Sequence, residues 1–146
     1  MSRRPVGALV ALLAVLSVVV SACGAAPSTP KAEAQEVVVK VSEFAFEPAE
    51  IRAKVGQPVR IVLQNDGTLL HDFSSDDAKV EVIKSAGAEH EAHDAQPSST
   101  VPHVAADVGK QATLEFMPTE AGTYTFYCSV EGHKEAGMVG RLIVTE

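Results

Sequence analysis

Three potential metal ligands near the end of the chain constrain its fold more than any other feature. Cys128, His133 and Met138 follow one another at intervals of five residues. The alternating run "TYTFYC" that ends at Cys128 predicts a strand whose core face includes the cysteine. The apolar run "VGRLIV" after Met138 predicts a second strand. We therefore expect one loop between two strands to present a thiol, an imidazole and a thioether to a single point.

The chemistry of these side chains selects a metal. Gly132 and Gly137 directly precede the histidine and the methionine. Glycine allows the sharp turns that would bring both side chains back toward Cys128. Soft sulfur combined with imidazole favours copper, and the blue-copper arrangement is a plane of one cysteine and two histidines with a weak axial methionine. That arrangement requires a second histidine from elsewhere in the chain.

His71 is the best candidate for the second histidine. It lies in "NDGTLLHDF", directly after a predicted strand and turn, with apolar residues on its N-terminal side. The remaining histidines lie in polar sequence. Because His71 is far from Cys128 along the chain, only a folded β-sandwich can bring the two together. The predicted metal ligands are His71, Cys128, His133 and Met138.

Each of these residues also has an ordinary structural interpretation. Cys128 would pair with Cys23 in a disulfide, since export favours disulfides, unless a lipid modifies Cys23. His133 alone is compatible with a surface histidine, and Met138 alone with a core side chain. Their combination at this spacing, between two strands, favours copper over these alternatives.

The remaining sequence favours an all-β sandwich. Short runs rich in β-branched residues are separated by Gly, Pro and Asn turns, and no long helical pattern occurs. One polar stretch, Lys84 to Gly109, is expected to be an excursion between strands, partly helical or mobile. It holds His90, His93 and His103, whose "HEAH" spacing leaves a second metal open, although surface histidines are the simpler interpretation. Further predicted strands are "EVVVKVSEFAF", "VRIVLQN" and "ATLEFMP".

On these residues, the chain resembles the plastocyanin/azurin-type cupredoxins. The segments "FYCSVEGHKEAGMVGRLIV" and "NDGTLLHDF" are similar to the two ligand segments of that family. The Cys-x4-His-x4-Met spacing is closer to auracyanin and rusticyanin than to plastocyanin. The resemblance covers Val37 to Glu146 without the polar stretch. It implies a Greek-key β-sandwich that holds one mononuclear type 1 copper on the four predicted ligands and shuttles single electrons.

The resemblance also implies how the two ligand segments are linked. In the family, the residue after the first histidine bonds the residue after the cysteine, and here those are Asp72 and Ser129. We expect the Asp72 carboxylate to accept a hydrogen bond from Ser129. The N–H groups of Asp72 and Val130 should point at the Cys128 sulfur. Two positions depart from the family, since Asp72 replaces an asparagine and Glu131 stands where proline is common.

The first segment resembles an export signal rather than part of the fold. Arg3 and Arg4 precede an apolar run, Val6 to Val20, that is too short for a comfortable membrane span. Small residues before Cys23 resemble a bacterial lipobox, so we expect a lipid on Cys23 that anchors the exported protein to the cell membrane, facing the periplasm or the cell exterior. The paired arginines leave general and twin-arginine export open. The predicted organisation is a signal peptide (1–22), a lipid-anchored flexible tether (23–35) and a cupredoxin domain (36–146).

Charge and ligand set restrict the function. The chain has 12 Lys and Arg and 19 Asp and Glu residues, a net charge of -7, and no basic cluster, which argues against a nucleic-acid partner. An acidic chain favours redox partners with cationic docking surfaces. Because Met138 takes the fourth ligand position, no position is free for a substrate, and we expect a monomeric electron carrier rather than an enzyme. A protein that stores or delivers copper is the alternative.

Electrons are expected to enter and leave near the ligand loop. One edge of the His133 ring should reach the surface, within an apolar rim formed by Leu69, Leu70 and Ala136. A second exit is predicted through Cys128 to Tyr127, whose side chain should face the opposite side of the strand.

Overall fold

The chain folds into ten strands and no helix over the residues that the computed structural model describes, 33–88 and 100–146. In this part of the chain there is accordingly no helix with the length and apolar character needed to cross a membrane. The strands are β1 (Gln35–Ser42), β2 (Ala45–Glu47), β3 (Glu50–Lys54), β4 (Val59–Asn65), β5 (His71–Ser74), β6 (Val80–Ala86), β7 (His103–Ala106), β8 (Gln111–Pro118), β9 (Gly122–Tyr127) and β10 (Val139–Thr145).

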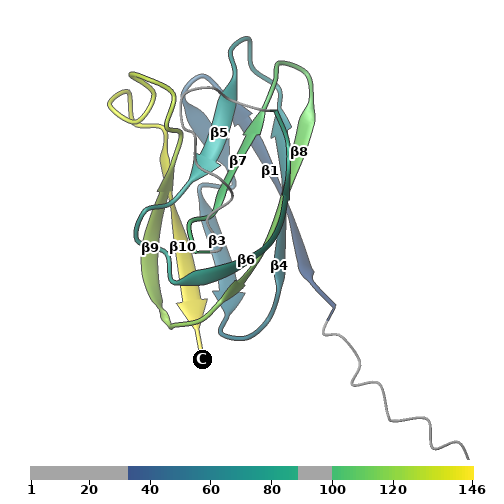
Figure 1. The fold of residues 1–146 in the computed structure, drawn as a ribbon. Helices are drawn as coiled ribbons and strands as arrows, with labels where there is room; N and C mark the ends of the chain where they lie inside the picture. The colour runs from purple at the N-terminus through teal and green to yellow at the C-terminus, as the bar shows by residue number, and fades with distance from the viewer. Residues whose placement is uncertain (1–32, 89–99) are drawn as a thin grey trace, which may run out of the picture. The chain divides into compact units, whose positions relative to one another are not determined.

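The strands form two sheets of five that pack face to face (Figure 1). One sheet has the order β2-β1-β4-β8-β6, and the other has the order β3-β10-β9-β5-β7. Two neighbouring pairs, β1 with β4 and β3 with β10, are parallel, and the other pairs are antiparallel. Consecutive strands repeatedly cross from one sheet to the other. The predicted all-β sandwich is therefore confirmed.

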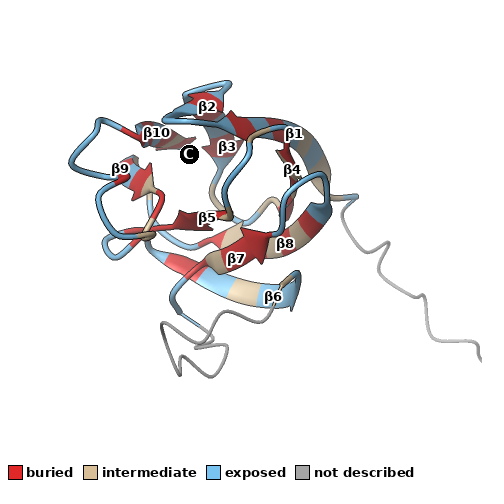
Figure 2. Cartoon of the chain, turned by 90° about the horizontal axis from the view of Figure 1, so that it is seen from above, coloured by how far each residue is buried: buried red, intermediate tan, exposed pale blue. Residues whose placement is uncertain are grey.

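Period-two alternation places one face of most strands in the core. Along β8, buried residues alternate with half-buried or exposed ones, and β10 behaves in the same way (Figure 2). Three phenylalanines pack together between the sheets. The rings of Phe73 and Phe126 stack at 26° to one another with centroids 4.7 Å apart, and Phe46 meets Phe126 edge-on at 5.0 Å. Full burial of one such side chain contributes about 1.5–3 kcal/mol. This aromatic cluster supports the strands that carry two of the predicted ligands.

The predicted excursion from Lys84 to Gly109 is wrong at both of its ends. Strand β6 continues through Lys84 to Ala86, and His103–Ala106 forms β7, the edge strand beside β5. Strand β7 is difficult to predict from the sequence because it has only four residues, and because its two alanines are both buried although they face opposite sides of the strand. His90 and His93 lie outside the described residues.

Two further short strands have no clear signal in the sequence. The residues of β5, "HDFS", are all buried and show no alternation, and β3 carries charged residues at three of its five positions. Strand β1 begins at Gln35, the last residue assigned to the predicted tether. The predicted signal peptide, the predicted lipidation site at Cys23 and most of the predicted tether lie outside the described residues.

Candidate metal centre

The structure brings three of the predicted ligands to one buried point. The donor atoms of His71, Cys128 and His133 lie within 4.8 Å of one another, and all three residues are buried. The Cys128 Sγ atom is 3.3 Å from His133 Nδ1 and 3.9 Å from His71 Nδ1. Both imidazoles therefore turn the same ring nitrogen toward the sulfur, which is the geometry that a shared cation requires.

Strand pairing accounts for the meeting of residues that are far apart in the sequence. Strand β5 lies beside β9, with Ser74 opposite Tyr127. Because the two strands are antiparallel, His71 at the start of β5 lies near Cys128, which directly follows β9. The long-range part of the ligand prediction, that the sandwich brings His71 to Cys128, is thus confirmed.

Hydrogen-bonded turns bring the ligand loop back to its starting point. The Cys128 N–H donates to the Met138 carbonyl at 3.2 Å, and the Met138 N–H donates to the His133 carbonyl at 3.0 Å. The two glycines before the histidine and the methionine have φ angles of 83° and 94° (Gly132 and Gly137), a region that favours glycine. Met138 is fully buried at the end of the loop. The predicted turning role of both glycines is confirmed.

The Cys128 sulfur is held by backbone donors in a closed environment. The Asp72 N–H donates to Sγ at 3.4 Å, and a backbone hydrogen bond from Val130 adds a second donor, as predicted. Burial raises the pKa of the Cys128 thiol to about 11, although these two donors act in the opposite direction. A cation at the site must therefore displace the thiol proton, which couples metal binding to proton release.

Asp72 and Ser129 tie the two ligand segments together. The Ser129 N–H donates to Asp72 Oδ1 at 2.6 Å, and the Ser129 hydroxyl donates to Oδ2. The predicted link is confirmed. On its own, burial would raise the pKa of Asp72, but the contacts with His103 and Ser129 outweigh burial and lower it. The His103 contact, 3.4 Å from Nε2 to Oδ2, was not predicted, because His103 was assigned to the polar stretch.

The histidine environment suits a soft cation. His71 is completely buried, and burial lowers its pKa, with a second contribution from the charge of His133 when that ring is protonated. A neutral imidazole is the form that binds metal. One thiol and two imidazoles, shielded from water, fit copper. The donor set of the site is therefore consistent with the metal predicted from the sequence.

A turn that the sequence interpretation overlooked covers both imidazoles. Glu43 and Phe44, between β1 and β2, approach His71 and His133 respectively. The prediction that one edge of the His133 ring reaches the surface is wrong, because His133 is only 5% exposed and Phe44 packs against it. Nothing local in "SEFA" signals this role, since both contacts are made across the sandwich.

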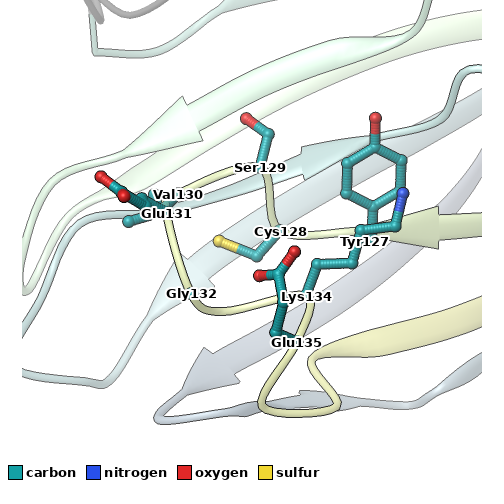
Figure 3. Close-up of a pocket in the computed structure, with 8 residues that line it drawn as sticks. All are labelled: Tyr127, Cys128, Ser129, Val130, Glu131, Gly132, Lys134 and Glu135. Carbon is teal, nitrogen blue, oxygen red and sulfur yellow. The ribbon is translucent and has the colours of Figure 1, made fainter.

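The outer side of the ligand loop forms a shallow hollow, shown in Figure 3. There the Cys128 sulfur and the Tyr127 ring point to different sides, as strand alternation predicts. The Tyr127 hydroxyl donates to Asp76 at 2.6 Å, and the Lys134 ammonium lies 3.7 Å from the centre of the Tyr127 ring. Burial and the Asp76 contact both raise the pKa of Tyr127, so its phenol stays protonated.

Comparisons with known proteins agree with this geometry. A family model described as multicopper oxidase matches residues 26–146. The copper-resistant cuproprotein CopI of Pseudomonas aeruginosa is 30% identical over 150 residues, covering 81% of this chain and 80% of that protein. The CopI protein of Rubrivivax gelatinosus is 31% identical over 114 residues, covering 78% and 68%.

Solved structures share the fold. Auracyanin B is 18% identical, with a TM-score of 0.59 over 81% of this chain and 94% of its own. Reduced auracyanin from Roseiflexus castenholzii is 21% identical, with a TM-score of 0.57 over 80% of this chain and 100% of its own. Both are similar to this chain in fold, and the predicted resemblance to cupredoxins is confirmed.

Proposed function

Because the chain belongs to the multicopper oxidase family and has the cupredoxin fold, we propose that it binds one type 1 copper ion and shuttles single electrons. The ligands in this proposal are His71, Cys128, His133 and Met138. The observation that carries it is the buried cluster of one thiol and two imidazoles whose donor atoms lie within 4.8 Å of one another. When bound, copper supplies a one-electron couple at this point.

The protein's contribution is to hold the donor atoms still. His71 begins a buried strand, Cys128 directly follows another, and His133 and Met138 are fixed by hydrogen-bonded turns. The Asp72 N–H stabilises negative charge on the Cys128 sulfur. A ligand set that cannot rearrange spends little energy on reorganisation when the charge changes, and this property suits electron transfer.

We further propose that the domain is not an enzyme, although its family carries the name oxidase. Support comes from the donor set, in which protein side chains provide all four proposed ligands, and the four residues are buried. Among the described residues, His71, Cys128 and His133 form the one group of His, Cys, Asp and Glu side chains arranged to hold a metal ion.

In this proposal the protein is exported, monomeric and anchored through a lipid on Cys23. Residues 1–22 hold two arginines and no acidic residue, so removing them changes the net charge from -7 to -9. This negative charge would attract redox partners with cationic docking surfaces, and association would slow as salt rises because salt screens the attraction. The exposed Leu69 and the half-buried Leu70 would form part of the apolar rim where such a partner docks.

A role in copper resistance is the second candidate, because two relatives are named copper-resistant cuproproteins. Such a protein would store copper or deliver it to a recipient, rather than use it to carry electrons. Repeated one-electron cycling separates the two functions. An electron carrier retains its copper through many cycles, whereas a delivery protein loses copper to a chelator or to a recipient protein when reduced.

The primary test is spectroscopic. Residues 24–146 loaded with Cu(II) should show an intense visible band from thiolate-to-copper charge transfer. Cys128→Ser should abolish the band, and His71→Ala should weaken or displace it. His103→Gln is the matched control, since His103 contacts Asp72 but lies outside the donor cluster, and this variant should keep the band. Absence of the band in the parent protein would refute the proposed site.

A further inference from the structure

Glu43 is tied to the segment that precedes His71. It lies in the turn between β1 and β2, and its Oε1 atom accepts three hydrogen bonds from that segment. The donors are the Thr68 N–H at 2.6 Å, the Leu69 N–H at 3.0 Å and the Thr68 hydroxyl at 3.1 Å. These hydrogen bonds therefore fix the position of the Glu43 carboxylate.

The same oxygen faces the ring of His71. Glu43 Oε1 lies 3.6 Å from His71 Nε2, which is buried and has no hydrogen-bond partner among the residues that the structure describes. Gly67 makes this approach possible, because a Cβ atom there would lie 2.8 Å from Oε1 and 3.0 Å from Nε2. A side chain at position 67 would thus compete with the carboxylate for the space beside the ring.

A metal-binding histidine normally donates its second ring N–H to a carboxylate, a carbonyl or water, and that partner fixes the tautomer. We propose that Glu43 is the positioning residue for His71, and that the negative charge of its carboxylate holds the ring proton on Nε2 and so leaves the Nδ1 lone pair for the metal. Its negative charge also favours the more highly charged oxidised copper. This inference rests on the proposed copper site. At 3.6 Å the attraction is electrostatic, since the separation exceeds that of a normal hydrogen bond.

A purely structural role for Glu43 is the competing explanation, since the three hydrogen bonds to Thr68 and Leu69 alone could account for it. Glu43→Gln separates the two roles. Glutamine keeps a side-chain oxygen that can accept the loop hydrogen bonds, but it lacks the negative charge that faces His71. Glu135→Gln is the matched control, because it removes one charge from the exposed part of the ligand loop.

The first measurement is the reduction potential of the copper-loaded variants. We expect Glu43→Gln to shift the equilibrium toward reduced copper by about tenfold relative to Glu135→Gln, which corresponds to about 59 mV for one electron. The second is the ¹⁵N spectrum of the His71 ring in the copper-free protein. There the parent should hold the proton on Nε2, and Glu43→Gln should mix the two tautomers.

Gly67→Ala provides an independent route to the same result. The added methyl group should push the Glu43 carboxylate away from the His71 ring, so the potential should rise as in Glu43→Gln. The double variant should then show little additional shift. Equal potentials for Glu43→Gln and Glu135→Gln, with an unchanged His71 tautomer, would overturn the inference. If the copper-loaded parent protein showed no visible band, the proposed copper site would be refuted instead. The tautomer measurement on the copper-free protein would still test whether Glu43 positions the His71 ring.

Discussion

The ring of Phe44 lies edge-on against the imidazole of His133, with centroids 5.0 Å apart and planes inclined by 76°. Phe44 is 42% exposed, whereas His133 is 5% exposed. An aromatic side chain from the turn between β1 and β2, rather than the ligand histidine, therefore lies at the surface on this side of the metal centre. We therefore expect this side chain to limit access to the site by water and chelators.

Phe44→Ala should make the site more accessible without changing its ligands. An edge-to-face pair is worth about 0.5–1.5 kcal/mol, so we expect a chelator to remove copper up to about tenfold faster, with the visible band retained. Stopped-flow measurements with excess chelator provide the test. Leu69→Ala is the control, since Leu69 is about as exposed as Phe44, 47% against 42%, but has no aromatic ring to pair with His133. Equal rates for both variants would mean that Phe44 does not protect the site.

Asp72→Ala should destabilise the copper-free protein, because it leaves the N–H and the hydroxyl of Ser129 without their acceptor. A fully buried group left unpaired costs about 1–3 kcal/mol. Because Ser129 is only half-buried, the free energy of unfolding should fall by about 1–3 kcal/mol. Chemical denaturation measures the change. Asp66→Ala is the control, since Asp66 is exposed, and it should stay within about 0.5 kcal/mol of the parent.

The copper-free protein should lose stability as the pH falls below the ordinary histidine value. The pKa of His71 is lowered in the folded state, so the unfolded chain takes up a proton first, at about pH 6.5. Below that pH the free energy of unfolding should decrease, by at most about 1.4 kcal/mol per pH unit, until the folded pKa is reached. Urea titrations at neutral and mildly acidic pH test this, and His71→Asn should show a smaller decrease. An identical pH dependence in both proteins would contradict the prediction.

Leu69→Glu should slow electron transfer to a partner that docks through an apolar contact. The substitution places a charge on an exposed side chain near the metal centre, so the rate should fall while the visible band stays unchanged. Transfer to a small basic cytochrome, followed at several salt concentrations, measures the effect. Val38→Glu adds the same charge at a residue of β1 with similar exposure, 46% against 47% for Leu69, and should leave the rate nearly unchanged. A rate that is indifferent to both Leu69→Glu and salt would exclude the proposed docking surface.

Local patterns in the sequence were sufficient for the ligand loop. Cys128, His133 and Met138 lie in one short segment, and alternation before and after it predicts the two strands that the structure contains. The Asp72–Ser129 link joins residues 57 positions apart, and its prediction came from the resemblance to the cupredoxins rather than from a local pattern. The ligand loop itself could be predicted without knowledge of the fold, because it depends on neighbours in the chain.

Short buried strands were harder to predict, because both faces of such a strand are packed against other residues. In β5 and β7, the alternation that identifies an ordinary strand is absent, and tertiary packing rather than local propensity determines the conformation. His103 consequently became a partner of Asp72 instead of a surface histidine in a polar excursion.

The metal chemistry of this protein could be predicted from the chain alone, because Cys128, His133 and Met138 lie in one short segment at a characteristic spacing. The way in which that chemistry is enclosed depends on the folded molecule. Glu43 meets His71, and Phe44 meets His133, because the turn between β1 and β2 reaches the ligands across the sandwich. Contacts between segments so far apart depend on the three-dimensional arrangement of strands, and no periodicity within either segment records them.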